Sequence, residues 1–120
     1  MGLMDKIFGG GNTVKPLETS DETFENDVIK SELPVMLDLW SPTCMPCQVL
    51  GGMLRELAPE YADKVKIIKL NVSQNMQTAM RFKIRGVPTV LFFKNGRLVD
   101  QMVGLAPMEV LRQRLDKLAE

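Results

Sequence analysis

The sequence contains no histidine and only two cysteines in 120 residues. The lack of histidine excludes Ser-His and Cys-His catalysis and removes the imidazole ligand of most zinc enzymes. No apolar run approaches the roughly 20 residues that a membrane-spanning helix needs. Fifteen basic residues balance fifteen acidic ones, so we expect binding neither to nucleic acid nor to a membrane surface.

The length and composition are those of one globular domain. Its 45% hydrophobic and 25% charged content are ordinary, and 120 residues suffice for a single core. The first residues, MGLMDKIFGGGN, are too short and too charged for a secretory signal. We therefore expect a flexible arm at 1–13, with docking through Ile7 and Phe8 as the alternative, and a domain over 14–120.

Hydrophobic periodicity changes repeatedly along the chain and predicts alternating strands and helices. Strand-like runs lie at 14–17, 34–40 and 65–72. Helical patterns follow each run, with Ser20 and Ser73 as candidate caps of the first and third helices. In the second helix the apolar residues recur at helical spacing, at Leu50, Met53, Leu54, Leu57 and Tyr61.

The last third of the chain predicts a hairpin and a final helix. Two strand-like runs, 88–93 and 97–103, flank Asn95-Gly96, a strong hairpin turn signal. The final helix follows Pro107 and places apolar residues on one face, at Met108, Leu111, Leu115 and Leu118. The order βαβαβαββα predicts an α/β fold with a mixed sheet layered by helices on both sides.

The two cysteines, Cys44 and Cys47, flank Met45-Pro46 between a strand-like run and a helical one. As a structural disulfide the pair would stabilise the fold only weakly. The loop-entropy model assigns a stabilisation of roughly 2 kcal/mol to a disulfide that closes so short a loop, compared with about 4.7 kcal/mol for a 100-residue loop. A zinc site usually takes four protein ligands, and this chain offers two thiolates and no imidazole.

A redox pair explains the placement of the cysteines better. The start of a helix stabilises a thiolate at Cys44, and Cys47, three residues on, lies within disulfide reach. Pro46 fits a helix's first turn and stiffens the loop between the sulfurs. We favour the redox interpretation over a metal or iron-sulfur site and over a structural disulfide.

Several segments in register resemble the thioredoxin family. They are LDLWSPTCMPCQ (37–48), KLNV (69–72), IRGVPTVLFFKNG (84–96) and VG (103–104), within a match from about residue 14 to the C-terminal helix. The resemblance implies a thioredoxin-like three-layer sandwich, with a central mixed sheet flanked by about four helices.

The resemblance also implies roles for individual residues. Cys44 would be the attacking thiolate and Cys47 the resolving thiol. Asp38, the one charge in an apolar strand, would accept the proton of Cys47 through water, near Lys69. The substrate groove would be formed by Trp40, Thr43, Met45, Pro46, Val87, Pro88 and Gly104. The peptide bond before Pro88 would be cis.

Three features depart from the family's pattern or lie outside it. Met45 replaces the usual glycine between the cysteines and Thr43 the usual tryptophan, which leaves the redox potential and the partner set open. We assign most of the nine methionines to the core, Met36, Met53 and Met80 among them. Arg81, Lys83 and Arg85 form a basic cluster, either a solvated surface or a means of steering toward acidic partners.

We therefore expect a protein-disulfide reductase that needs no bound metal or cofactor. Its partners would be protein disulfides and a thioredoxin reductase-type electron donor, and it would act as a monomer in the cytoplasm. The alternatives are a specialised redox partner or oxidant, and a binding module whose cysteines hold a metal or an iron-sulfur cluster.

Overall fold

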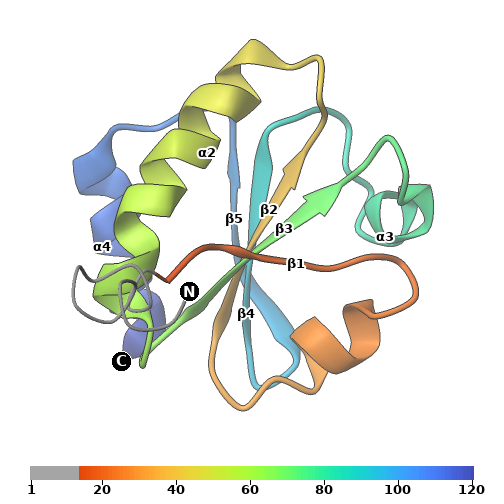
Figure 1. The fold of residues 1–120 in the computed structure, drawn as a ribbon. Helices are drawn as coiled ribbons and strands as arrows, with labels where there is room; N and C mark the ends of the chain where they lie inside the picture. The colour runs from red at the N-terminus through yellow and green to blue at the C-terminus, as the bar shows by residue number, and fades with distance from the viewer. Residues whose placement is uncertain (1–13) are drawn as a thin grey trace, which may run out of the picture.

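A computed structural model describes residues 14–120, which form a five-stranded sheet with helices on both faces (Figure 1). The strands lie in the order β1-β3-β2-β4-β5. Their bounds are Leu17–Glu18 (β1), Val35–Trp40 (β2), Lys66–Asn71 (β3), Thr89–Lys94 (β4) and Arg97–Val103 (β5). The expectations for the N-terminal arm and for Ile7 and Phe8 lie outside the described residues.

The sheet is mixed, as predicted. Strand β3 runs parallel to both β1 and β2, whereas β4 is antiparallel to β2 and β5 is antiparallel to β4. The hairpin turn at Asn95-Gly96 has both residues at positive φ, 54° and 77°. The α/β sandwich expected from the element order is confirmed.

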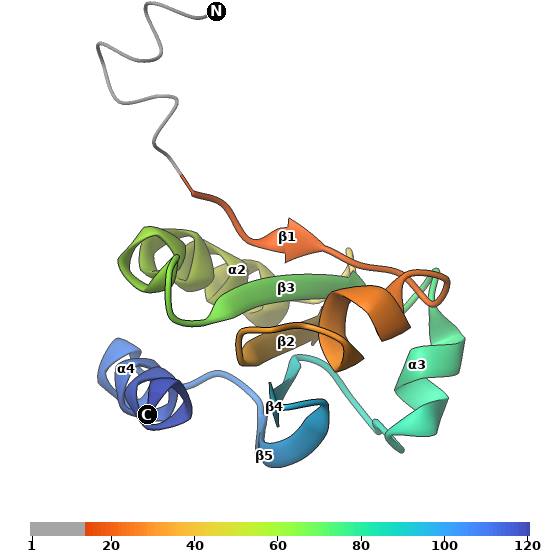
Figure 2. The same ribbon diagram turned by 90° about the horizontal axis from the view of Figure 1, so that it is seen from below.

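Helices cover both faces of the sheet, as the edge-on view shows (Figure 2). One face carries α2 (Met45–Leu57), which continues into the 3-10 turn η3 (Ala58–Tyr61), and α4 (Met108–Ala119). The other face carries η2 (Glu25–Ile29), a single π-helical turn, and the short helix α3 (Met76–Arg81).

Each face has its own hydrophobic core. Toward α2 and α4, the buried cluster includes Met36, Leu50, Leu54, Phe92, Leu111 and Leu115. Toward η2 and α3, it includes Phe24, Val28, Leu37, Ile68, Leu91 and Phe93. Strand β2 contributes alternate residues to both clusters, which explains why its sequence reads as a nearly continuous apolar run.

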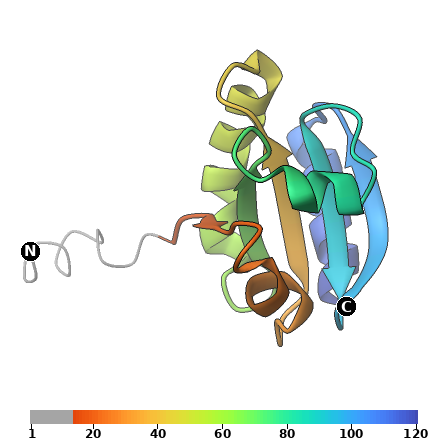
Figure 3. The ribbon, with the colours of Figure 1, turned by 90° about the vertical axis from the view of Figure 1, so that its right-hand side faces the viewer.

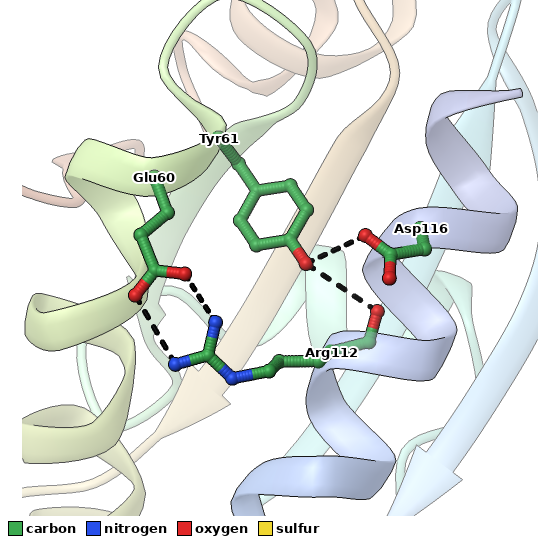
Figure 4. Close-up of polar contacts among 4 residues, drawn as sticks. All are labelled: Glu60, Tyr61, Arg112 and Asp116. Atoms are coloured by element: carbon green, nitrogen blue, oxygen red, sulfur yellow. Dashed lines mark hydrogen bonds and ion pairs between the residues drawn. The ribbon is translucent and has the colours of Figure 1, made fainter.

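Helix α4 is joined to η3 by a polar cluster at the edge of the first core (Figure 4). The Tyr61 hydroxyl donates a hydrogen bond of 2.7 Å to Oδ1 of Asp116. Burial first, and then this bond to Asp116, raise the pKa of Tyr61 to about 12. Beside it, the Arg112 guanidinium forms a two-point ion pair with Glu60.

Three local expectations were wrong. Strand β1 pairs only at Leu17 and Glu18 rather than over 14–17; Pro16 has no N–H to donate to a strand ladder. Ser73 does not cap α3, because its amide and hydroxyl both donate to Asn71 Oδ1. Met80 is 71% exposed rather than part of the core.

Within residues 14–120, none of the helices combines the length and apolar character required to cross a membrane.

Candidate active site

Most of the predicted site residues belong to the segments at the end of the sheet where β2 and β3 end and β4 begins, an end that Figures 1 and 3 show, while Asp38 and Lys69 lie within β2 and β3. Trp40 is the last residue of β2, and Cys44 immediately precedes α2. Pro88 immediately precedes β4, and Gly104 follows β5. The sheet therefore brings together groups that are up to 64 positions apart in the sequence, from Trp40 to Gly104.

Cys44 is the N-cap residue of α2 and has an extended backbone, with φ −105° and ψ 109°. Its Sγ accepts a hydrogen bond of 3.2 Å from the backbone N–H of Cys47. Pro46 lies in the first turn, where a proline removes no helical hydrogen bond. This geometry places Cys44 Sγ where helix amides stabilise negative charge on sulfur.

Cys44 and Cys47 form a disulfide in the structure, with their Cα atoms 5.2 Å apart. The two cysteines differ in exposure, because Cys44 is partly exposed and Cys47 is only 3% exposed. A substrate disulfide can therefore approach Cys44 more readily than Cys47. Met45 lies between them with 74% of its surface exposed, so it stands at the mouth of the site.

The chain before β4 lies directly against Cys44. The carbonyl oxygen of Val87 is 3.7 Å from Cys44 Sγ. The Val87–Pro88 peptide bond is cis, the conformation that the resemblance implies. Gly104, at φ +87°, donates its N–H to the Pro88 carbonyl at 2.8 Å, so this glycine lies beside the same segment.

Asp38 is fully buried in β2, the strand that leads to the cysteines. Neither carboxylate oxygen has a hydrogen-bond partner among residues 14–120. Burial therefore raises the pKa of Asp38 to about 7, although the positive charge of Lys69 acts to lower it. Such a carboxyl group can hold or release a proton near neutral pH.

Lys69 pairs with Asp38 in the register of β2 and β3, as the resemblance implied. Its ammonium group lies 4.5 Å from the centre of the Trp40 ring, a cation–π contact. Trp40 is partly exposed and so is neither pure core nor a fully open groove wall. Lys69 therefore contacts the last residue of β2 and also lies beside the buried Asp38 in the paired strands.

Sequence reasoning missed the residue that anchors α3. Asp21, far away in sequence, accepts hydrogen bonds from the N–H groups of Gln77 and Thr78, at 3.2 and 2.8 Å, and from the Thr78 hydroxyl. Partial burial acts to raise the pKa of Asp21, but these bonds outweigh it and hold the pKa below its ordinary value. No local spacing signals a cap that comes from another segment.

The basic cluster is not uniform. Arg81 pairs with Glu25 at 3.2 Å and lies over the rings of Phe24 and Phe82. Lys83 and Arg85 are exposed and have no ion-pair partner within the part of the chain that the structure describes. Only these last two carry positive charge that remains open to a partner.

The fold and the cysteine pair are those of a dithiol–disulfide exchange protein, and comparisons with known proteins agree. The family model described as "Thioredoxin" matches residues 15–117. A thioredoxin from Synechocystis sp. is 42% identical over 100 residues, which cover 83% of this chain and 94% of the relative. A thioredoxin from Haemophilus influenzae is 46% identical over 91 residues, covering 76% and 85%.

The chain belongs to the thioredoxin family. It is a protein-disulfide reductase with a Cys-x-x-Cys redox pair. Membership in the family implies that its substrates are protein disulfides and that a reductase supplies its electrons.

Proposed function

We propose that the active site has the form Cys44-Met45-Pro46-Cys47 and that Cys44 attacks the substrate. The observation that carries this assignment is the position of Cys44: it caps α2, accepts the Cys47 amide at 3.2 Å, and is the more exposed sulfur. All three favour a reactive thiolate there.

In the first step, the Cys44 thiolate attacks one sulfur of the substrate disulfide. A Cys44–substrate disulfide forms, the substrate S–S bond breaks, and the other substrate sulfur leaves as a thiolate. In the second step, Cys47 loses its proton and attacks Cys44 Sγ. This step forms the Cys44–Cys47 disulfide and releases the second substrate thiolate, so the enzyme gives up two electrons in total.

The proton of Cys47 passes to Asp38 through water. Two observations support this role: Asp38 is buried in the strand that leads to the cysteines, and its pKa is about 7. Lys69 tunes the acid through its positive charge. A carboxyl group with an ordinary pKa would accept the proton far less readily at neutral pH.

The substrate segment lies along the surface around Cys44, between Val87 and Gly104 on one side and Trp40, Thr43, Met45 and Pro46 on the other. The 3.7 Å approach of the Val87 carbonyl to Cys44 Sγ supports this, because an extended substrate can pair with that backbone. We also propose that the protein acts as a monomer. A reducing compartment such as the cytoplasm suits regeneration of the dithiol.

Serine variants at the two cysteines test the assignment. Insulin reduction is measured with a thioredoxin reductase as electron donor. We expect Cys44→Ser to abolish turnover, and Cys47→Ser to stop after the first step and accumulate mixed disulfides visible on non-reducing gels. Full turnover by Cys47→Ser, or mixed disulfides accumulating through Cys47 in Cys44→Ser, would overturn the assignment.

A further inference from the structure

A groove of about 390 Å³ opens beside the cysteine pair, between α3 and the chain that enters β4. Most of its wall is apolar, from Val72, Met76, Ala79, Met80, Ile84 and Val87. We propose that Met76, Met80 and Arg85 make this methionine groove selective, so that it prefers substrate segments in which a bulky apolar residue and an acidic residue flank the reactive cysteine. This inference rests on the proposed attack by Cys44 and adds a preference among substrates.

The groove is continuous with the site of attack. Val87 lines it, and the carbonyl oxygen of the same residue is 3.7 Å from Cys44 Sγ. Ser41, which follows the last residue of β2, lines it as well. An extended chain advances about 3.3 Å per residue, so a segment joined to Cys44 brings its nearest neighbours over the groove.

The wall formed by α3 exposes two large apolar side chains to solvent. Met76 and Met80 are 63% and 71% exposed. They are four residues apart and therefore lie on one face of the helix. Methionine is unbranched and polarizable, so it adapts to apolar groups of different shape. Two exposed methionines beside a reactive site mark an interaction surface rather than filler.

The charge at the rim of the groove points to an acidic element in the bound segment. Arg85 lines the groove, and Lys83, two residues earlier, is exposed nearby. Neither forms an ion pair within residues 14–120, whereas Arg81 is already engaged with Glu25. Unpaired positive charge at the edge of an apolar surface attracts an acidic side chain and disfavours a basic one.

The position of α3 is set before a substrate arrives. Asp21 holds the first turn of the helix by accepting three hydrogen bonds, and Thr78, whose side chain donates one of them, is buried. A groove whose wall is already fixed loses little entropy on binding. The methionine side chains can move, while the backbone that carries them does not need to.

Three disulfides test the proposal. Two are capped peptides of equal length, each joined to glutathione through its one cysteine. The cysteine is flanked by Leu and Glu in one peptide and by Ser and Gln in the other. The third is hydroxyethyl disulfide, which is too small to reach the groove from Cys44. We expect the wild-type kcat/KM to be about tenfold higher for the Leu/Glu peptide, since partial burial of a leucine contributes roughly 1–2 kcal/mol.

Variants then separate the effect of the groove on substrate preference from the rate of disulfide exchange itself. We expect Met76→Ser/Met80→Ser to remove most of the preference while hydroxyethyl disulfide is reduced within about twofold of wild type. Met76→Leu/Met80→Leu retains an apolar wall and should keep the preference. Arg85→Gln should lessen the advantage of Glu and its dependence on salt. Val99→Ser, a change at a 54% exposed residue of β5 outside the groove, is the matched control.

The results distinguish a failure of the groove proposal from a failure of the proposed function. If wild type reduces hydroxyethyl disulfide but treats both peptides alike, or if the serine pair and the leucine pair behave alike, the groove proposal is wrong and the proposed function stands. If wild type reduces none of the three disulfides, or Cys44→Ser still reduces them, the proposed function itself fails.

Discussion

At Asp38, the stability of the fold conflicts with the proton-accepting role that we propose. The carboxyl is fully buried and has no hydrogen-bond partner among the described residues, an arrangement that a purely structural acid avoids. The nearest cation in register, Lys69, lies over the Trp40 ring rather than in an ion pair with Asp38. The pKa near 7 is therefore the net result of strong desolvation and a weaker attraction to Lys69.

At the residue scale, Asp38→Asn should slow the second step and spare the first. Without an acceptor, Cys47 must ionise unaided, so we expect resolution of the mixed disulfide to fall by about ten- to a hundredfold between pH 6 and 8. The gap should narrow toward pH 9, where a thiol ionises on its own. Stopped-flow reduction of a model disulfide from pH 5 to 9 resolves the two steps.

The control for this experiment is Asp63→Asn, which changes an exposed carboxylate outside the site. It should leave both steps unchanged. If Asp38→Asn resolves the mixed disulfide at the wild-type rate across the whole pH range, Asp38 has a structural role only.

At the scale of elements, the parts that the sequence predicted correctly are those whose signal is local. The apolar run of β2 and the Asn95-Gly96 hairpin each follow from adjacent residues, and the structure has both within a residue or two. The cysteine pair at the start of α2 is equally local. A short stretch with its own period or turn chemistry leaves few alternatives.

The parts that sequence reasoning missed depend on contacts between distant segments. Helix α3 has only six residues, so its periodicity cannot show which side faces the core, and Met80 was assigned inward although it is 71% exposed. Its cap comes from Asp21, more than fifty positions away. The roles of Asp38 and Lys69 came from the resemblance to a family, since spacing alone does not pair residues of two strands.

The trans-segment cap of α3 can be measured directly. Asp21→Ala leaves the amides of Gln77 and Thr78 without their acceptor, so we expect a loss of about 1–2 kcal/mol in the free energy of unfolding at pH 7. Because the folded-state pKa of Asp21 is lowered, this stability is present above the unfolded pKa near 4 and is lost as pH falls through the lower folded value.

Urea titrations at pH 7 and at decreasing pH provide the measurement, with the exposed neighbour Glu22→Ala as the control. Asp21→Asn keeps one acceptor oxygen and should lose less than Asp21→Ala. A loss of the same size at pH 7 and below the folded pKa of Asp21 would show that packing, rather than the charged cap, holds the helix.

Replacing a glycine in the middle of α2 should increase the stability of the protein. A Cβ added at Gly52 would meet only the far end of Arg55, at 3.6 Å, so Gly52→Ala should stabilise the protein by about 1 kcal/mol through helix propensity. Gly96→Ala should do the opposite, because φ is +77° and the Cβ would lie 2.9 Å from the Ile29 carbonyl oxygen. Thermal melts of both variants decide; two changes of the same sign would contradict the prediction.

At the scale of the whole molecule, the strand that leads to the cysteines takes part in both cores. Strand β2 supplies Met36 to the cluster under α2 and α4, and Leu37 and Leu39 to the cluster under η2 and α3. Asp38 alternates with Leu37 and Leu39, so its side chain lies on the same face of the sheet as Met36, the face that α2 and α4 cover. Ionisation of Asp38 therefore lowers the free energy of unfolding of the whole protein.

That cost has a definite pH window. The folded-state pKa of Asp38 is about 7, whereas its ordinary value is 3.8. Below about pH 4 the carboxyl is protonated in both the folded and the unfolded state, and wild type then loses stability as the pH rises from about 4 to 7. Asp38→Asn removes the ionisation. Each pKa unit corresponds to about 1.4 kcal/mol, so the variant should be more stable than wild type by a few kcal/mol at pH 8 and by little at pH 4. Guanidinium titrations of the oxidised proteins at pH 4, 6 and 8, with Asp63→Asn in parallel, measure this; an equal gain at every pH would assign the effect to packing instead of charge.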